Sequence, residues 1–363
     1  MITKLDLPEM PDGMTAAWLT PLLRQCGLIS ADTEVTQVEQ QLLGEGTGMM
    51  SDLVRLSLDY AGGAGPASLV AKFSARNDTN RAVAMQFNLY ERETRYFAEL
   101  DQLTSSYSPA TYVSALDEDQ FLILMDDLSD YRVGNQASGA GLTDTELMVD
   151  ELAKLHASFW NQVDDLTWVP TIADSYHAEN MAALIKVGWP VMVETFGDCL
   201  SPQVAAMGEA FSAGLPKLQA AMVQRPITLL HGDYRMENVM FGTHPEHHPA
   251  AIIDWQGPLR GCGLVDLSVV LCGSTQIDVR RGHEKALVQR YVEGLAKHGV
   301  QGYGEQAWQD YRMATLYNWV YVGVIAGTLD ATNEKGVAWI SQMLKRQDAA
   351  TLDHELIELL QRL

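Results

Sequence analysis

The stretch LLHGDYRMENVMF at residues 229–241, followed by AAIIDW at residues 250–255, decides the fold of this chain. Short apolar runs bounded by glycine and proline are typical of β-strands. Three such runs occur here, at Ile227–Leu230, Val239–Phe241 and Ala251–Ile253. We therefore expect three short strands whose ends carry polar side chains.

The polar side chains at these strand ends are Asp233, Asn238 and Asp254. Because the strands are expected to be neighbours, the three side chains should lie close together. Two hard oxygen ligands and one further carboxylate are what magnesium-nucleotide phosphoryl transfer requires, since the metal prefers oxygen donors and the attacking hydroxyl needs a proton acceptor. The alternative is that these groups only cap turns, which the ordered set of three disfavours.

The pattern His-Gly-Asp-x-x-x-x-Asn followed by Ile-Asp-Trp resembles the aminoglycoside phosphotransferase and choline kinase superfamily, and most closely its ecdysteroid-kinase-like branch. The resemblance implies that Asp233 is the catalytic base and that Asn238 and Asp254 bind Mg²⁺. It also implies that His231 supports the loop and that Asp266 anchors it through backbone N–H groups. A helix N-cap is the other interpretation of Asp266, and both interpretations can hold together.

The composition is that of a globular protein: of the 363 residues, 47% are apolar and 20% are charged. A net charge of −22 argues against nucleic acid as a partner. No apolar run is long enough to predict a membrane span, and the N-terminus lacks an apolar signal core. Four scattered cysteines without metal-type spacing favour a reduced, cytoplasmic compartment.

Upstream, two predicted strands at 35–43 and 52–60 flank a glycine-rich turn containing Gly44, Gly46 and Gly48, with Ser51 just after it. A turn of this kind can place backbone N–H groups over phosphates. It is not a Walker motif, because no Gly-Lys-Ser/Thr follows. Most such turns are plain hairpins, so its interest comes from its position before Asp233.

A third predicted strand, Ser68–Ser74, carries Lys72 in an apolar run. The resemblance assigns Lys72 to the nucleotide phosphates, whereas a lone lysine of this kind is usually at a sheet edge. Residues 79–100 contain no glycine or proline and predict one helix. On it Glu93 shares a face with apolar residues, which is costly for an unpaired carboxylate. Lys72 is its natural partner, and Glu91 is the competitor.

A hairpin at 111–116 and 120–125 leads to Asp126 and Leu128, which resemble the family's hinge, where the backbone meets the adenine edge. The acidic pair there can also be only a turn. Residues 143–160 predict a helix capped by Thr143 with Glu146 three residues later. His156 on this helix is better explained as a hydrogen-bonded core histidine than as a base. The histidine-rich tract at 243–249 predicts an exposed loop rather than a zinc site.

The resemblance implies an α+β, protein-kinase-like two-lobe fold, with a small β-rich N-lobe at 1–126 and a larger, mainly helical C-lobe at 127–363. It implies ATP and Mg²⁺ as cofactors, with GTP as an alternative nucleotide, and a small hydroxylated substrate as phosphate acceptor. The sequence does not reveal the acceptor or separate a monomer from a homodimer. Trp255-Gln256 in place of Phe-Gly, the absence of an arginine before Asp233 and the absence of an Ala-Pro-Glu segment disfavour a protein kinase.

Two alternatives to this function remain open. One is an antibiotic or amine-alcohol kinase of the aminoglycoside or choline type. The other is a non-catalytic nucleotide-binding regulator on the same fold, which the complete set of Lys72, Glu93, Asp233, Asn238 and Asp254 disfavours.

Overall fold

The computed structural model describes residues 7–8, 11–44, 50–118, 120–328 and 334–363. The chain forms two compact units. One comprises Met1–Gln102 and Ser108–Ser129, and the other comprises Leu103–Tyr107 and Asp130–Leu363. The sequence carries no signal for the inclusion of Leu103–Tyr107 in the second unit. This segment is held there because the Tyr107 carbonyl accepts a hydrogen bond from Ile252 N at 2.8 Å.

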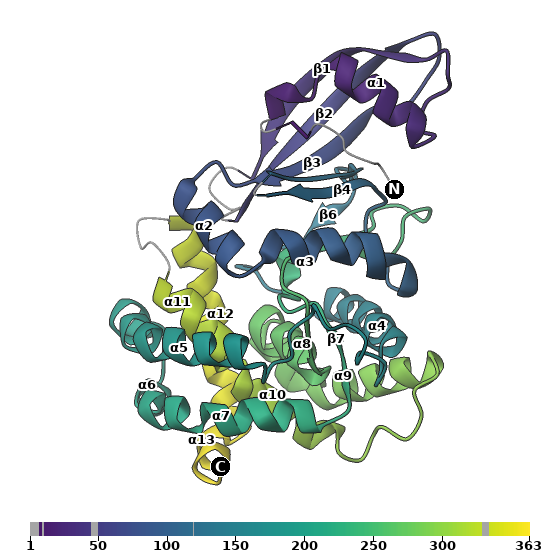
Figure 1. Ribbon diagram of the computed structural model, residues 1–363. Coiled ribbons are helices and arrows are strands. Elements are labelled where there is room, and N and C mark those ends of the chain that lie inside the picture. Colours follow the sequence, from purple (N-terminus) through teal and green to yellow (C-terminus); the bar gives the residue numbers. More distant parts are fainter. Residues whose placement is uncertain (1–6, 9–10, 45–49, 119, 329–333) are drawn as a thin grey trace. The chain divides into compact units, whose positions relative to one another are not determined.

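The first unit is built on a five-stranded antiparallel sheet in the order β1-β2-β3-β5-β4. Its strands are β1 (Glu34–Leu43), β2 (Ser51–Ala61), β3 (Ser68–Ser74), β4 (Thr111–Asp117) and β5 (Gln120–Asp126). Alternate residues of β2 are buried, including Val54, Leu56 and Leu58, as the period-two pattern predicts. Helix α1 (Ala16–Gln25) covers one face of the sheet at β1 (Figure 1).

The prediction of one continuous helix over 79–100 is wrong, because this region is divided into three helical segments. The structure has α2 (Asp78–Gln86), α3 (Leu89–Arg95) and a π-helical turn (Tyr96–Leu100). The break falls at Asn88, whose φ of 53° is left-handed. Asparagine adopts this conformation more readily than most residues, so a search for glycine and proline alone overlooks the break.

The second unit is mainly helical and carries two small antiparallel sheets, β10-β7 and β6-β8-β9. The strands are β6 (Arg132–Val133), β7 (Ile227–Leu230), β8 (Val239–Phe241), β9 (Ala250–Ile252) and β10 (Leu259–Cys262). Its α-helices are α4 (Leu142–Ser158), α5 (Ser175–Phe196), α6 (Pro202–Ala205), α7 (Gly208–Gln224), α8 (Leu264–Ser268), α9 (Ile277–Lys297), α10 (Ala307–Tyr317), α11 (Trp319–Thr328), α12 (Glu334–Asp353) and α13 (Leu356–Gln361). A π-helical turn, Val269–Ser274, follows α8.

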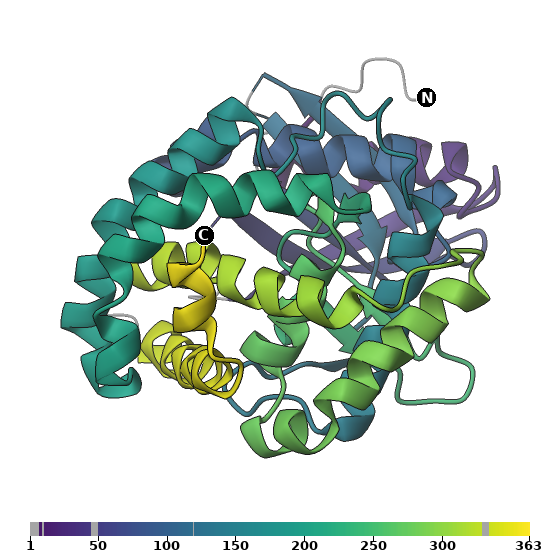
Figure 2. The same cartoon turned by 90° about the horizontal axis from the view of Figure 1, so that it is seen from below.

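Helix α5 packs against both α7 and α11 (Figure 2). Helix α5 runs through Pro190 without ending there. Gly188, two residues before Pro190, lies against α11: a Cβ added to Gly188 would stand 3.0 Å from the carbonyl oxygen of Gly323. Tertiary packing against the apolar α11 therefore outweighs the helix-breaking tendency of this proline.

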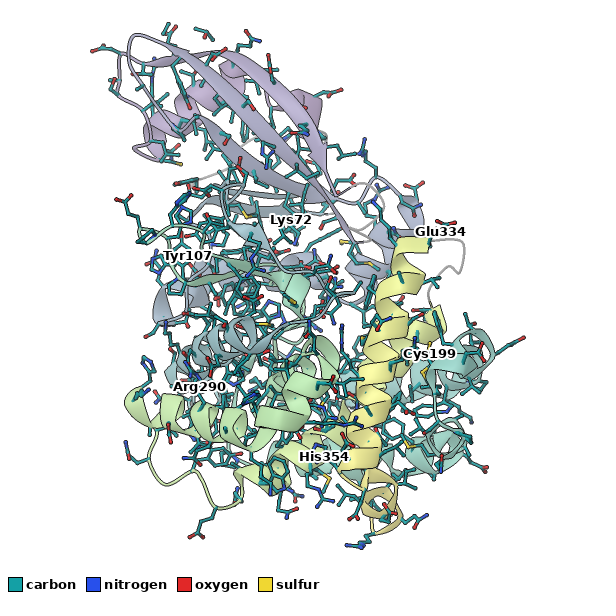
Figure 3. The ribbon with its side chains drawn as sticks, turned by 180° about the vertical axis from the view of Figure 1, so that it is seen from behind. Lys72, Tyr107, Cys199, Arg290, Glu334 and His354 are labelled. Carbon is teal, nitrogen blue, oxygen red and sulfur yellow. The ribbon has the colours of Figure 1, made fainter. Side chains whose placement is uncertain are left out.

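One further helix prediction differs from the structure. The residue before α4 is Gly141, and no side chain caps the helix, so the predicted capping box at Thr143 and Glu146 is wrong. Glu146 instead lies 3.4 Å from Arg290. At the C-terminal end, α12 is continuous over twenty residues, from Glu334 to the residue before His354 (Figure 3).

Across the part of the chain that the structure describes, no helix is both long and apolar enough to cross a membrane. All four cysteines are free thiols. Burial raises the pKa of Cys262 and of Cys272 to about 12, so both are protonated at neutral pH.

Candidate active site

The loop after β7 is held by one buried carboxylate, that of Asp266. Asp266 accepts hydrogen bonds from His231 N at 2.7 Å and from Gly232 N at 3.2 Å. It also accepts one from His156 Nε2 at 3.3 Å, and the other ring nitrogen of His156 accepts from the Tyr291 hydroxyl at 2.8 Å. His156 is therefore a satisfied core histidine, as expected. Asp266 lies inside α8, whose N-cap is Gly263, so it does not act as a helix N-cap.

His231 holds the loop from within. Its Nδ1 accepts a hydrogen bond from Asp233 N at 3.2 Å, and its Nε2 donates one to the Ile253 carbonyl at 3.0 Å. An accepting Nδ1 carries no proton, so the hydrogen bonds assign the neutral Nε2–H tautomer. The imidazole thus links Asp233 to the residue just before Asp254.

Gly232 allows the sharp turn between His231 and Asp233. Its φ is +83°, and an added Cβ would lie 1.9 Å from the carbonyl oxygen of Gly257. Both the left-handed backbone and this close approach require glycine.

Asp233 and Asn238 are joined directly. The Asn238 amide Nδ2 donates to the Asp233 main-chain oxygen at 2.9 Å and to its side-chain Oδ2 at 3.0 Å. Arg235 Nε also donates to Oδ2, at 3.2 Å. Both donors therefore hold the same carboxylate oxygen, and Asp233 keeps 41% of its side-chain surface exposed. Among the described residues, Oδ1 of Asp233 has no hydrogen-bond partner.

Asp254 is brought to the same place by strand pairing. Val239 of β8 pairs with Ile252 of β9, and Ile253 N donates to the Asn238 carbonyl at 3.0 Å. Asp254 then adopts a left-handed φ of 67°, an uncommon conformation for a non-glycine residue. Uncommon backbone conformations gather at functional sites when the surroundings enforce them, and here His231 and the β8–β9 pair do so.

Arg235 is a member of this site that the sequence analysis did not single out. It contacts Asp233 and donates to Glu237 Oε2 at 2.8 Å, and its guanidinium lies 4.9 Å from the ring centre of Trp339. Burial lowers its pKa, but Asp233, Glu237 and Asp254 outweigh burial and raise it. The signal was in the quoted motif: a cation two residues from a carboxylate proposed as a base.

The donor set of this loop suits a magnesium ion. Asn238 donates its hydrogen bonds to Asp233 through Nδ2, so its Oδ1 could serve as an oxygen ligand to the metal. Asp254 supplies a carboxylate as a second ligand. Magnesium is commonly held by one or two such protein oxygens, with phosphates and water completing the octahedron. No group of three or more His, Cys, Asp and Glu side chains suited to a metal occurs in the described residues.

In the first unit, Lys72 and Glu93 form a buried ion pair. Lys72 Nζ lies 2.7 Å from Glu93 Oε1, and their side chains are 5% and 1% exposed. Lys72 comes from β3, where it pairs with Leu53 and Ile123 in the two neighbouring strands. Glu91 instead lies on the exposed side of α3, 3.7 Å from Arg95. The structure therefore pairs Lys72 with Glu93, the partner that the helix face indicates.

The remaining residues assigned to nucleotide binding are only partly described. Gly46 and Gly48 lie outside the described residues. Gly44 has a φ of +66°, and Ser51 is the first residue of β2. Asp126 ends β5 and accepts a hydrogen bond from the Tyr112 hydroxyl, and Leu128 is buried.

Of the acidic pair, Asp126 is the last residue of β5, and Asp127 directly follows the strand. Asp127 accepts from Ser129 N at 2.9 Å and pairs with Arg55 at 2.9 Å. The histidine-rich tract between β8 and β9 is a loop, as predicted. There His247 stacks on Tyr131 and His248 stacks on Tyr107.

Comparison with known proteins places this geometry in a family. A model of the ecdysteroid kinase-like family matches residues 45–301, more than half of the 363-residue chain. No curated protein sequence is significantly similar to the chain.

Several solved structures share the fold. A Ralstonia eutropha protein assigned as an aminoglycoside phosphotransferase is 14% identical, with 93% of this chain and 97% of that one covered and a TM-score of 0.55. The GDP complex of an aminoglycoside 2′-phosphotransferase-IIIa mutant is 12% identical, with 91% and 96% covered and a TM-score of 0.53. Choline kinase from Cryptosporidium parvum is 10% identical, with 90% and 89% covered and a TM-score of 0.51.

At these identities the likeness establishes the fold alone. The predicted protein-kinase-like α+β fold is confirmed, with an antiparallel sheet in one unit and a mainly helical second unit.

Proposed function

The chain belongs to the ecdysteroid kinase-like family, and from this premise we propose that it is an ATP-dependent kinase that phosphorylates a hydroxyl group of a small organic acceptor. The observation that carries the proposal is the joining of Asp233, Asn238 and Asp254 at the ends of β7, β8 and β9. A binding module would not need a carboxylate held at one oxygen beside two potential magnesium ligands.

Asp233 is proposed as the residue that receives the acceptor hydroxyl. Its Oδ2 is occupied by Asn238 and Arg235, so the hydroxyl would donate to Oδ1. A carboxylate fixed in this way presents one oxygen in a defined direction, which favours alignment of the attacking hydroxyl. The hydroxyl oxygen attacks the γ-phosphorus of the nucleotide, the bond from that phosphorus to the bridging oxygen breaks, and the nucleoside diphosphate leaves, while Asp233 takes up the proton of the hydroxyl.

Asn238 and Asp254 are the residues that would hold magnesium. When bound, the ion would offset negative charge on the phosphates. The chain's own contribution is to keep both side chains in place: the Asn238 main chain pairs with Ile253, and His231 bonds the Ile253 carbonyl.

Lys72 is proposed to bind the α- and β-phosphates of the nucleotide, with Glu93 holding its ammonium group. The pair is buried in the first unit, where a Lys72 without Glu93 would lose charge stabilisation. The GDP complex of the aminoglycoside 2′-phosphotransferase-IIIa mutant supports a nucleotide as phosphate donor and makes GTP the competitor to test.

The direct test is a metabolite screen for phosphorylation. Purified protein with MgATP or MgGTP is incubated with a metabolite extract, and new species heavier by one phosphoryl group are sought by mass spectrometry. We expect at least one hydroxylated metabolite to be phosphorylated by the wild type and not by Asp233→Asn. A nucleotide that binds without any product, in the screen and in slow hydrolysis alike, would favour the non-catalytic regulator.

A further inference from the structure

Helix α12 is linked to the loop that carries Asp233 in two ways, once directly and once through Gln136. Trp339 and Arg346 are seven residues apart on α12, which is two helical turns, so both project from the same face. Trp339 lies under the Arg235 guanidinium at 4.9 Å. Arg346 reaches the segment around Gln136, which itself binds Met236. Arg235 and Met236 are consecutive residues of the loop.

The first contact holds a cation against the proposed base. The Arg235 guanidinium is bounded by Asp233 at 3.2 Å, Glu237 at 2.8 Å and the face of Trp339. A tryptophan face attracts a guanidinium and also restricts its rotation. Trp339 therefore contacts the same guanidinium whose Nε binds Oδ2 of Asp233.

The second contact uses a buried cation that has no carboxylate partner among the described residues. Arg346 is 4% exposed, and its guanidinium donates to three main-chain oxygens. These are Gln136 O at 2.6 Å, Ala137 O at 2.9 Å and Gly273 O at 3.2 Å. Gly139 leaves the room for it, since a Cβ there would lie 2.4 Å from Nη2. A buried charge satisfied only by carbonyls is costly, so this arrangement requires a role that offsets the cost.

Gln136 in turn contacts the loop through its side chain. Its side-chain Oε1 accepts from Met236 N at 3.1 Å, and its Nε2 donates to Gly273 O at 3.0 Å. Ser274 Oγ bonds both Gln136 Oε1 and Met236 N, each at 3.1 Å. The Gly134 backbone lies so close that a Cβ would stand 2.0 Å from Met236 O. Arg346 thereby fixes the backbone of the loop midway between Asp233 and Asn238.

We propose that α12 positions the transfer reaction: Trp339 holds Arg235 and so orients the Asp233 carboxylate, while Arg346 acts through Gln136 to fix the backbone at Met236. The inference rests on the proposed function, with Asp233 as the base. Trp339, Arg346 and Gln136 are positioning residues, since each acts through the loop. A ligand or partner that shifts α12 would change turnover without touching the reacting atoms.

A double-mutant cycle between Trp339→Leu and Arg235→Met tests the first contact. We expect Trp339→Leu to lower kcat on the order of 10- to 100-fold, as for a small misplacement of a reacting group, with nucleotide affinity unchanged. If Trp339 acts through Arg235, the double variant is no slower than Arg235→Met alone. Multiplicative losses would overturn the proposal.

The matched control is Trp308→Leu. Trp308 is also partly buried on a helix of the second unit and also faces a cation, Lys285, at 5.6 Å. Its ring lies against Tyr311 and His354, which are outside the loop. We expect a similar loss of thermal stability with kcat unchanged. An equal fall in kcat would mean that any lost tryptophan slows the protein, which contradicts a positioning role.

Gln136→Leu tests the second contact without removing the buried charge, because Arg346 binds the main-chain oxygen of residue 136. We expect kcat to fall while KM for the nucleotide stays the same. Gln219→Leu is its control: Gln219 is equally buried and binds the Ala178 carbonyl at 3.2 Å, away from the loop. Equal kcat values for the two variants would overturn the role of Gln136.

A readout without turnover separates this inference from the proposed function. In nitrogen-15 NMR of arginine side chains, we expect a slowly exchanging Arg235 Nε–H signal in the wild type. It should exchange rapidly in Trp339→Leu and stay protected in Trp308→Leu. A protein that turns over no nucleotide but shows these signals would refute the kinase proposal and keep the positioning by α12. An Arg235 signal equally protected in Trp339→Leu would refute the positioning itself.

Discussion

The side-chain amide of Asn238 donates a 3.0 Å hydrogen bond to Oδ2 of Asp233, the same oxygen that accepts from Arg235. One oxygen of the proposed base is thus held by two donors, and the other is left for a substrate. The relationship also fixes the Asn238 amide, because Nδ2 toward Asp233 means that Oδ1 points elsewhere. This hydrogen bond therefore orients both side chains: it holds Oδ2 of Asp233 and turns Oδ1 of Asn238 away from it.

Asp233→Asn is expected to abolish turnover while nucleotide affinity stays near that of the wild type. Asparagine keeps the size of the side chain but cannot take a proton, and loss of a general base costs about 10² to 10⁴ in rate. The measurement pairs turnover with nucleotide titration. Full activity in this variant would place the base elsewhere.

Asp254→Asn is expected to lose turnover for a different reason from Asp233→Asn. Asp254 is proposed to bind magnesium, so its amide variant should lose metal affinity as well as rate. Titration of MgATP and of metal-free ATP distinguishes the two variants. Unchanged magnesium affinity in Asp254→Asn would contradict its assignment as a ligand.

Lys72→Ala and Glu93→Ala are expected to reduce turnover strongly, whereas Glu91→Ala should be mild. The ion pair of Lys72 and Glu93 is buried at 2.7 Å, and removing either partner leaves an uncompensated charge. Glu91 is about half exposed, 3.7 Å from Arg95, and such pairs contribute little. Turnover and thermal stability of all three variants provide the check. Equal effects of the two glutamates would contradict the role given to Glu93.

Nucleotide binding is expected to depend on magnesium. The chain carries a net charge of −22, and Asp233, Glu237 and Asp254 all lie close enough to raise the pKa of Arg235. Free ATP should therefore be repelled from this loop unless a cation intervenes. Calorimetry with magnesium and with a chelator measures the difference, and equally tight binding in both would refute the metal assignment.

Glu284 is expected to stabilise the second unit in a pH-dependent way. Burial raises its pKa, but hydrogen bonds and charges from His354, Arg280 and Tyr311 outweigh burial and lower it below 4.5. The folded pKa is depressed, so the contribution is complete above the unfolded pKa and is lost as pH falls through the folded value. We expect Glu284→Gln to lower the free energy of unfolding by about 2 kcal/mol at pH 7.

Denaturant unfolding of the wild type and Glu284→Gln between pH 7 and pH 4 measures this contribution. The difference between them should be constant down to about pH 5 and shrink only below about 4.5. A difference that grows as the pH falls would contradict the depressed pKa.

The sequence by itself determined the class of fold and the chemistry gathered at one loop. Period-two alternation gave β2 correctly, because the two faces of a strand meet different surroundings. Apolar runs ending in Asp233 and Asp254 identified strand ends, since a short buried run must stop where polar groups begin. The pairing of Lys72 with Glu93 was also predictable, because a carboxylate on an apolar helix face needs a cation.

Only the tertiary structure decided how that chemistry is held. Asn88 breaks a helix and Pro190 does not, because packing outweighs local preference. Arg235 lies in the decisive motif, but its partner Trp339 is more than a hundred residues away. Arg346 reaches Gln136 from 210 residues away in the sequence. Contacts of this range leave no periodic trace along the chain: each depends on two segments meeting in space, and a sequence read locally records only one of them.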